Sequence, residues 1–332
     1  MKLAKCQRGL SLIELMIAIT IGLVLLAGIL QIAVKSKSNY RVHEALSRTQ
    51  ETGRFALDIM ARDIRMADFW GCAQNVTKIT NNLNPLGTGY SSALSFSGGL
   101  SGTDGTSGQP DTITLAGASG SGIHVKTPYM PNTSAMIHTI SGTGLEQGDI
   151  VLLSDCIQGD IFQITNSNPS SSGSVVHNTG SAVNPGNYNP GACGGGGNSH
   201  CLSKTYEGDA QIYAMQALTY SINHPALEEP KLVRSKNGQT AVELVAGVEN
   251  MQFTYGEDTD GDGVVNIYRD ATNVSNWDEV LAVKIALLVR SREQVLPEAQ
   301  TYSFNGVDNI TATDLRIRRE FTLTITLRNR TS

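Results

Sequence analysis

The feature that most constrains this chain is an uninterrupted apolar segment close to its N-terminus. Residues 10–34 read LSLIELMIAITIGLVLLAGILQIAV, with Glu14 as the single charged residue and no proline. As an α-helix this segment is about 37 Å long, enough to cross a hydrocarbon core of about 30 Å. A cleaved secretory signal has a shorter apolar region and a small-residue cleavage site behind it, and neither occurs here. The segment therefore predicts a helix that spans a membrane.

Glu14 is the residue that a plain membrane anchor does not explain. A charged side chain inside a membrane helix costs about 2.5–3.5 kcal/mol on insertion scales, so it calls for a function. In the plain-anchor interpretation the carboxylate extends to the headgroups and has no further role. Basic residues lie on both sides of the segment, so they do not set its orientation: these are Lys2, Lys5, Arg8, Lys35, Lys37 and Arg41.

The residues around Glu14 indicate such a function, because they resemble a known processing site. The stretch from Gly9 to Leu15, GLSLIEL, follows a short basic leader and resembles the processing site of type IV prepilins. The resemblance implies that a prepilin peptidase cleaves between Gly9 and Leu10, and that the new amino group of Leu10 is N-methylated. Leu10 stands where the family commonly has Phe. Glu14 is then the acidic residue at the fifth position of the mature chain.

The same resemblance implies a role for Glu14 in assembly. When apolar helices stack in a filament, each carboxylate enters a dry bundle, where an isolated charge is very costly. The nearest cation is the methylated amine of a neighbouring Leu10. Such a pair is expected to set the stagger between subunits, as buried polar groups set register in other assemblies.

The helix is expected to continue through residues 35–67 with one apolar stripe along a polar surface. Spacings of three, four and seven residues define the stripe. Packing on the protein's own sheet is favoured over packing on a partner, and Gly22 and Gly28 are the expected soft points of the helix. The stripe consists of Val42, Leu46, Gly53, Ala56, Met60, Ile64 and Ala67.

Residues 68–332 are expected to form one β-rich globular head. The clearest strand covers residues 320–327, where Phe321, Leu323 and Ile325 alternate with threonines. Two segments rich in Gly, Ser, Asn and Thr, about 75–110 and 166–200, are predicted as long surface loops. The predicted fold class is α+β, pilin-like, with a long N-terminal helix packed on an antiparallel sheet. The other predicted strands cover residues 112–116, 149–154, 161–165, 212–222, 242–245, 248–255 and 280–290.

Four downstream stretches are similar to the PilW family of minor pilins: FWGC after the helix, VENMQFTYGEDTDGD, VKIALLVRS and RREFTLTITLRN near the C-terminus. This similarity implies a part in starting and assembling a type IV pilus, near the pilus tip. The implied partners are other minor pilins, the major pilin, the prepilin peptidase, the inner-membrane assembly platform and a tip-associated adhesin. The implied location is a single pass in the inner membrane with the head in the periplasm, and then the pilus. A J-type pseudopilin of a type II secretion system has a similar plan and stays an alternative.

The cysteines indicate an oxidising compartment. Cys6 lies in the leader, and an even number then remains outside the membrane, which favours disulfides. Among the three possible connectivities we favour Cys72–Cys156, tying the helix end to the sheet, and Cys193–Cys201, closing a glycine-rich loop. The competing interpretation is a zinc site of Cys193, His200 and Cys201, which lacks the usual ligand spacing.

One acidic stretch resembles a calcium-binding loop. Asp258, Asp260 and Asp262 stand at alternate positions before Gly263, in the pattern D-x-D-x-D-G. The carbonyl of Val264 and the side chain of Asn266 are the next candidate ligands, and Glu257 adds a fourth acid nearby. The twelfth position is Arg269 instead of Glu, so water or one of Asp270, Asp278 and Glu279 must complete the shell. A solvated acidic turn without metal is the alternative interpretation.

Composition excludes several classes of function. The net charge of −5 argues against a nucleic-acid partner, which requires a basic face. No phosphate-binding loop, dinucleotide fingerprint or nucleophile elbow occurs, so the sequence predicts a protein without catalytic residues. A second functional hypothesis is a membrane-tethered, calcium-dependent adhesin or binding module.

Overall fold

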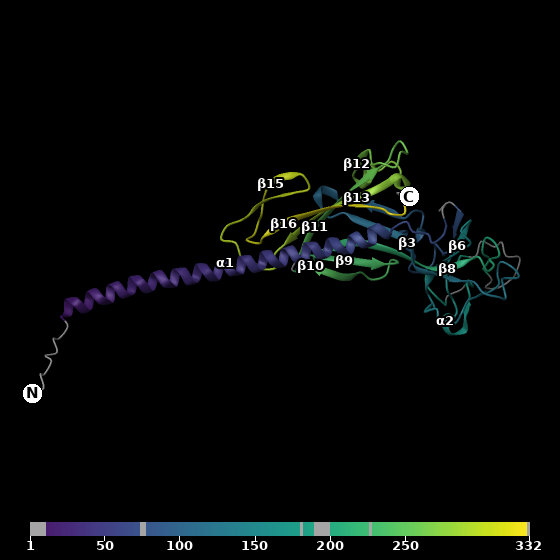
Figure 1. Ribbon diagram of the computed structural model, residues 1–332, viewed down its shortest axis with the longest axis horizontal. Helices are drawn as coiled ribbons and strands as arrows, with labels where there is room; N and C mark the ends of the chain where they lie inside the picture. The colour runs from purple at the N-terminus through teal and green to yellow at the C-terminus, as the bar shows by residue number, and fades with distance from the viewer. Residues whose placement is uncertain (1–10, 74–77, 180–181, 189–199, 226–227, 331–332) are drawn as a thin grey trace, which may run out of the picture.

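The structure is a computed structural model in which a long helix emerges from one end of a β-rich head (Figure 1). Helix α1 runs from Leu12 to Met66, and the side chain of Ser11 caps it by accepting a hydrogen bond from the Glu14 N–H at 3.2 Å. A hydroxyl at this position satisfies one of the backbone donors that a helix start leaves free. The residues described are 11–73, 78–179, 182–188, 200–225 and 228–330.

The larger sheet of the head is built around one long strand, β8 (Gln211–Asn223). One edge of β8 pairs with β3 (Thr112–His124), and the other edge pairs with β5 and β9. Strand β8 is therefore the central strand of the sheet. All its pairings are antiparallel except β1 with β6. The remaining strands are β1 (Ile79–Asn81), β2 (Leu100–Thr103), β5 (Ile150–Ser154), β6 (Gly159–Gln163), β9 (Lys231–Lys236) and β10 (Val242–Ala246).

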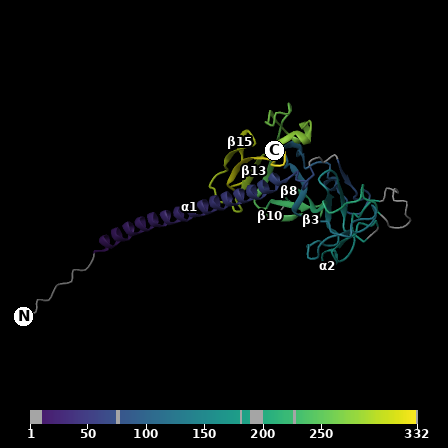
Figure 2. The same ribbon diagram turned by 45° about the vertical axis from the view of Figure 1, so that its right-hand side comes forward.

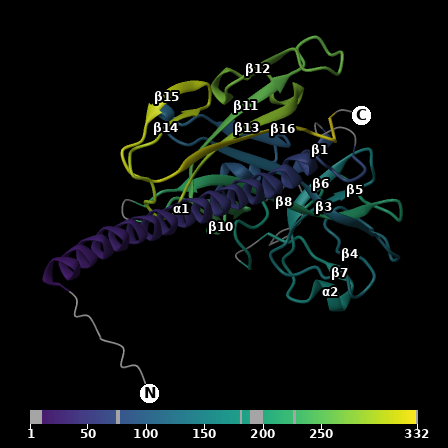
Figure 3. The same cartoon turned by 60° about the vertical axis from the view of Figure 1, so that its left-hand side comes forward.

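The smaller sheet has the order β12-β11-β13-β16 and is antiparallel throughout. Its strands are β11 (Val248–Glu257), β12 (Ile267–Arg269), β13 (Val280–Arg290) and β16 (Arg318–Thr326). The hairpin of β14 (Thr301–Phe304) and β15 (Val307–Thr311) contributes Phe304 to a small apolar cluster on this sheet. The short helix α2 (Pro169–Ser172) lies at the far end of the head (Figures 1 and 2). The short strands β4 (Ile137–His138) and β7 (Ser174–Val175) lie beside it (Figure 3).

The main core lies where α1 meets both sheets (Figure 3). Ala56, Met60 and Ile64 of α1 are fully buried against apolar side chains from β3, β8, β11 and β13. Gly53 lets the helix approach β16, because a Cβ atom on it would lie 2.5 Å from the Phe321 ring. The apolar stripe of the sequence therefore packs on the protein's own head, as predicted.

Polar contacts fix the end of the helix to the head. The Asp63 carboxylate accepts hydrogen bonds from the Tyr220 hydroxyl and from the Arg234 guanidinium, the latter at 2.9 Å. Two residues past the helix, Asp68 pairs with Arg330 near the C-terminus. The Arg330 guanidinium also donates a hydrogen bond to the Val280 carbonyl at 3.0 Å, so Arg330 holds the end of the helix against β13.

The predicted fold class is confirmed, and the structure refines it in two ways. The helix lies against two sheets, where the sequence indicated one. The two segments predicted as surface loops also hold β1, β2, α2 and β7, and they bury Leu83, Leu94 and Phe96. Gly99 and Gly102 in the first segment serve packing, because a Cβ atom there would collide with Asp68 and Tyr255.

A buried histidine pair lies in the far end of the head. The Nδ1 atoms of His177 and His200 are 3.0 Å apart, and the His177 Nε2 atom is 3.1 Å from the carbonyl oxygen of Ala135. The Ala135 carbonyl oxygen can only accept, so the Nε2 atom of His177 carries a proton. The Nδ1 atom of His177 then accepts the hydrogen bond that the Nδ1 atom of His200 donates. This assignment leaves the buried Nε2 of His200 as a bare acceptor, with no hydrogen-bond partner in the described part of the chain.

Filling the contact at Gly53 tests the packing of α1 on β16. We expect Gly53→Leu to lower the free energy of head unfolding by about 1–3 kcal/mol, the usual cost of overpacking. Removing the opposing ring, in Gly53→Leu/Phe321→Ala, should recover part of the loss. Gly28→Leu is the matched control, since a Cβ there meets nothing within 4 Å. Denaturant unfolding of the detergent-solubilised chain measures the effect, and equal losses at both glycines would contradict it.

The histidine pair predicts an acid-sensitive head. Burial, and then the adjacent His177, lowers the pKa of His200 to about 3, and burial also lowers the pKa of His177 although Asp160 opposes the shift. The unfolded chain therefore binds more protons below pH about 6.5, so stability is lost as the pH falls through that value. For His200 the loss amounts to roughly 2 kcal/mol by pH 5.

Hydrogen exchange of residues 174–178 and 200–206 at pH 7 and pH 5, corrected for intrinsic rates, measures this loss. His200→Asn removes the titrating group and should flatten the pH dependence. His43→Asn, on the exposed surface of α1, is the control. The explanation is wrong if His200→Asn loses protection at pH 5 as steeply as the parent chain.

Candidate assembly and metal-binding sites

The N-terminal half of α1 presents apolar side chains to its surroundings on every side. Leu12, Val24 and Ile32 are 76%, 72% and 70% exposed. Among the described residues, α1 is the one helix that is long and apolar enough to span a membrane. Such a surface requires a bilayer or other apolar helices around it, because water does not solvate it favourably.

Glu14 lies in the first turn of this apolar helix. Its position favours a carboxylate, since the free N–H groups and the dipole of a helix start attract negative charge. Its side chain is exposed and forms no ion pair within the described residues. The predicted processing residues Gly9 and Leu10 lie outside the described residues.

One disulfide joins the end of the helix to the larger sheet. Cys72 lies six residues past Met66 and is bonded to Cys156. Cys156 belongs to the turn between β5 and β6, where its backbone is left-handed at φ 71°. The bridge is the pair favoured from the sequence, and the two cysteines are 84 positions apart, so the loop between them holds about the first third of the head.

The other cysteines do not favour the zinc alternative. Cys201 is disulfide-bonded, and Cys193 lies outside the described residues. His200, the third proposed zinc ligand, is fully buried and pairs with His177. A bonded sulfur and an imidazole held by another histidine are poor zinc ligands.

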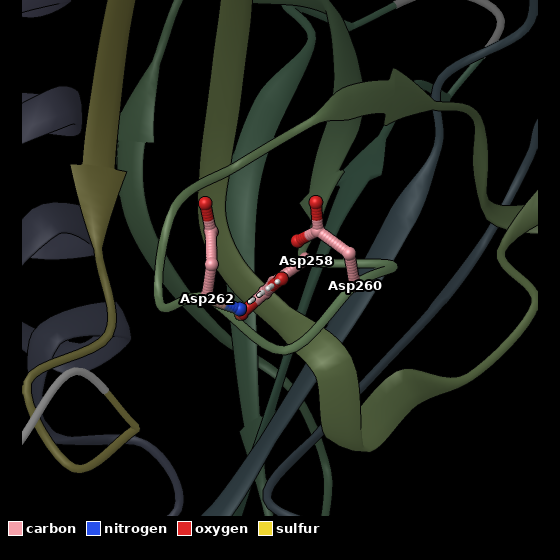
Figure 4. A group of neighbouring side chains, drawn as sticks. All are labelled: Asp258, Asp260 and Asp262. Atoms are coloured by element: carbon pink, nitrogen blue, oxygen red, sulfur yellow. Dashed lines mark hydrogen bonds between the residues drawn. The ribbon is translucent and has the colours of Figure 1, made fainter.

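The acidic stretch forms the exposed loop between β11 and β12. Asp258, Asp260 and Asp262 each place a carboxylate oxygen within 4.8 Å of the others (Figure 4). Oxygens bound to one Ca²⁺ at about 2.4 Å lie at most about 4.8 Å apart, so these three can share an ion. Asn266 faces the same loop, with its Nδ2 atom 3.2 Å from a carboxylate oxygen of Asp260.

The Asp258 side chain organises the loop by accepting hydrogen bonds from the loop's backbone N–H groups. Its carboxylate accepts hydrogen bonds from the N–H groups of Gly261, Asp262 and Gly263, at 2.8, 3.2 and 2.7 Å. Burial acts to raise the pKa of Asp258, but the hydrogen bonds from Gly263 and Gly261 outweigh it and lower the pKa below its usual value. A charged carboxylate is therefore the resting form, as a cation site requires.

The remaining acids near the loop have other partners. The Glu257 side chain is fully buried, accepts from the N–H groups of Ser275 and Asn276, and lies 2.8 Å from Arg269. Arg269, at the twelfth position, thus neutralises Glu257 on the inner side of the hairpin. Within the described residues the cluster contains only the three aspartates of the loop. The candidates Asp270, Asp278 and Glu279 do not join it, which leaves water to complete a metal shell.

The comparisons with known proteins match family models to two parts of the chain, one at each end. The prokaryotic N-terminal methylation motif matches residues 4–30, and the family described as type IV pilus-assembly protein W matches residues 212–329. The resemblance to PilW-type proteins is thereby confirmed. The PilW region begins at β8 and contains the smaller sheet, the acidic loop and β16.

The other comparisons are weaker. A type IV-like pilin from Thermus thermophilus aligns over 88% of this chain and 98% of its own, with 11% identity and a TM-score of 0.35. Among curated proteins no match is found. The similarity to PilW proteins therefore rests on the match over residues 212–329, and the methylation motif adds a prepilin-type N-terminus.

The sequence analysis missed two polar clusters. The histidine pair joins residues 23 positions apart, and no spacing rule predicts such a contact. A cluster of arginines gathers where the end of β13 meets α1, although Arg41 and Arg48 of the helix are more than 240 positions from Arg290 and Arg292. The sequence signal for this cluster is the pair Arg290 and Arg292 at the end of an apolar strand.

Proposed function

We propose that this PilW-type protein is a minor pilin that helps start and assemble a type IV pilus and lies near its tip. A prepilin peptidase cleaves after Gly9, and Leu10 becomes N-methylated. Residues 10–34 hold the chain in the inner membrane with the head in the periplasm until the subunit joins other minor pilins and the major pilin. The role is structural, because the chain acts by packing against other subunits.

The observation that carries the proposal is the continuity of α1. One helix of 55 residues is exposed and apolar in its first half and is packed into the head in its second. The head is therefore rigidly coupled to the segment that must find apolar partners. A subunit of this shape can leave a bilayer without losing burial only if other such helices replace the lipid.

Glu14 gives that transfer its specificity. In the membrane the carboxylate lies near the end of α1, where it can reach the headgroup region. In a filament it enters a bundle of apolar helices and needs a cation, which the methylated amine of a neighbouring Leu10 supplies. The ion pair then fixes how far one subunit is displaced along the next.

Two alternatives use the same features. A J-type pseudopilin would insert its helix into a secretion pseudopilus, and the PilW match favours the pilus. A calcium-dependent adhesin would use the acidic loop on the head as its binding surface. The exposed carboxylates of Asp260 and Asp262 support metal binding there, but they also suit a structural ion that stiffens the loop.

Calcium is the ion that this loop fits. Its ligands are the carboxylates of Asp258, Asp260 and Asp262, with the Val264 carbonyl as a further oxygen, and with water. The Asn266 side-chain oxygen accepts from the Thr259 N–H at 2.7 Å, so it would join the shell only after this amide turns over. Hard oxygen ligands in an uneven arrangement suit Ca²⁺ better than Mg²⁺, which demands a tight octahedron. Bound calcium would relieve the repulsion among the three acids and hold the hairpin of β11 and β12 in one conformation.

Replacing Glu14 tests the proposed assembly role. We expect Glu14→Ala to retain normal processing, seen by intact mass as loss of residues 1–9 and addition of one methyl group. Its recovery in sheared pili should fall by roughly a hundredfold, since an unpaired buried charge costs about 3 kcal/mol or more. Arg54→Ala, on the exposed surface of the same helix, is the control. Retention of Met1 in the parent chain would overturn the proposed processing, and normal piliation in Glu14→Ala would overturn the ion pair.

Calorimetric titration with Ca²⁺ tests the metal site. We expect a single site with a dissociation constant on the order of 10⁻⁴–10⁻³ M, as in extracellular modules. Asp260→Asn should weaken it at least about tenfold, because a charged ligand is lost while the Asp258 hydrogen bonds stay. Asp308→Asn, an exposed acid in β15, should leave it unchanged. Absence of heat from Ca²⁺, with an unshifted melting temperature, would establish the loop as a bare acidic turn.

A further inference from the structure

Strand β16 forms one edge of the smaller sheet. It pairs with β13 on one side and with no strand on the other, in the part of the chain that the structure describes. The Leu327 N–H donates to the Leu281 carbonyl of β13 at 2.9 Å, which fixes the alternation of hydrogen bonds along the pair. The odd-numbered residues of β16 therefore bond to β13, and the N–H and C=O groups of the even-numbered residues point away from it.

The side chain of Gln300 shows what this edge can bind. Its amide accepts a hydrogen bond from the Arg318 N–H at 2.8 Å and donates one to the Arg318 carbonyl at 3.0 Å. A neighbouring strand would form the same two bonds. Gln300 comes just before the hairpin of β14 and β15, so the hairpin closes the edge at the first residue of β16.

The rest of the edge is open and almost without charge. Residues 321–327 read FTLTITL, with no charged residue, proline or glycine, and their pairing with β13 has no bulge. Proteins usually protect a long edge with lysine, proline or a bulge, so an edge without them is suited to pairing with another strand. Three residues here are exposed, and the backbone groups that they turn to the edge have no hydrogen-bond partner within the described residues: Thr322, Thr324 and Thr326.

Apolar surface is also left uncovered beside this edge. Phe321 and Leu323 point to the face of the sheet that carries α1, but they are only partly buried. Ile325, further along the same face, is 1% exposed. Side chains of a strand added to β16 would lie about 5 Å from those of Phe321 and Leu323 and would cover them.

The ligand that matches such an edge is an extended polypeptide. Its N–H and C=O groups repeat every two residues, or about 6.8 Å, and the free groups of β16 have the same repeat. A lipid headgroup or a sugar has no such repeat. When a strand is added to a sheet, the main-chain hydrogen bonds supply the affinity and the alternate side chains supply the specificity.

The direction of β16 restricts the source of that polypeptide. Phe321 lies against Gly53, and the Asn329 side chain donates to the Ala67 carbonyl at 2.9 Å, so β16 runs along α1 in the same direction. Subunits anchored in one bilayer have parallel α1 helices, and their β16 strands are then parallel too. An antiparallel addition, which continues the pattern of the smaller sheet, therefore needs a different strand of the neighbour.

Strand β10 of a like subunit has the required direction. Val242, at its start, pairs with Arg234, which binds Asp63 late in α1. Ala246, at its end, lines one cavity together with Thr52, which lies earlier in α1. Among the described strands β10 pairs only with β9, so its other side is a second free edge. Strands β16 and β10 lie on opposite sides of α1, so subunits standing side by side can bring one to the other (Figures 1 and 3).

We propose that the free edge of β16 binds an antiparallel edge strand, the counterpart of β10, from the head of a neighbouring pilin-like subunit. The contact joins two different surfaces, so it can repeat from subunit to subunit along a helical assembly instead of closing into a symmetric pair. The inference rests on the proposed function, because the parallel α1 helices are what make the two edges antiparallel. It adds a contact between heads to the contact between apolar helices.

A photo-crosslinking amino acid in place of Thr322, in the full chain, tests the proposal in cells. The side chain at this position alternates with that of Phe321, so it lies on the sheet face away from α1 and outside the core. We expect cross-links to another pilin-like subunit, in a peptide from an edge strand of its head.

A proline variant tests the backbone contact itself. Thr324→Pro removes an N–H from the edge and leaves the bonds to β13 in place, as proline on an edge strand can. It should lower the cross-linking yield at least about fivefold, the effect of one lost hydrogen bond. Thr311→Pro is the matched control, because it removes an outward N–H from the free edge of β15 and should leave the yield unchanged.

Hydrogen exchange separates loss of binding from loss of folding. In the purified parent chain the N–H groups of Thr322, Thr324 and Thr326 should exchange fast, whereas those bonded to β13 stay protected. In the isolated complex of the parent chain with the cross-linked subunit, the same three groups should become protected. This measurement decides the question if Thr324→Pro lowers the melting temperature of the head.

Three results would overturn the proposal. The first is fast exchange of these groups in the complex, and the second is a cross-link that survives Thr324→Pro in a head with unchanged melting temperature. The third is a cross-link only to lipid or to a protein without a pilin-like head.

Processing and piliation in the same cells distinguish this inference from the proposed function. If the leader is removed and the protein reaches pili, but no cross-link depends on the Thr324 N–H, only the β16 proposal fails. If Met1 is retained and pili lack the protein, the proposed function fails and the β16 proposal fails with it.

Discussion

The constraint on which the whole structure depends is that one helix serves two environments. The first half of α1 is apolar on every side, whereas the second half buries a single stripe and leaves its other faces polar. The two halves form one continuous helix, so any force on the apolar half is carried directly into the head. The head must therefore hold the helix firmly, and two sheets rather than one supply the surface to do so.

The head holds the helix both by close packing and by polar contacts. Small residues at Gly53 and Ala56 bring the helix close to β16 and β13, and the large side chain of Phe321 fills the space. At the far end, Asp63, Asp68 and the Cys72–Cys156 bridge attach the helix to strands from both sheets. Apolar contact supplies most of the binding energy, and the polar contacts fix the helix at one position along its axis.

Sequence analysis predicts correctly those elements in which burial alone determines the spacing of the apolar residues. The strand at residues 280–290 is buried on both faces and has the predicted bounds, and Leu323 and Ile325 of β16 face the core as their alternation requires. The short strand β9 was missed, since lysines stand at both its ends and hide the pattern. The hairpin of β14 and β15 had a usable signal in Asn305 and Gly306, which both adopt positive φ. The arginine cluster and the histidine pair depend on contacts between distant residues, so local rules do not reveal them.

Two charges of the described chain lack a full partner. Within the described residues Glu14 is a carboxylate without a cation, and Arg290 is a buried cation whose nearest carboxylate is held by Arg318. Glu14 lies in the apolar half of α1, whereas Arg290 ends strand β13 in the smaller sheet. A monomer tolerates each only at a cost, by keeping Glu14 near water and by leaving Arg290 under-bonded. A neighbouring helix that brings a cation to Glu14, as proposed above, would remove the first of these costs, so the electrostatics of the single chain would favour association in one register.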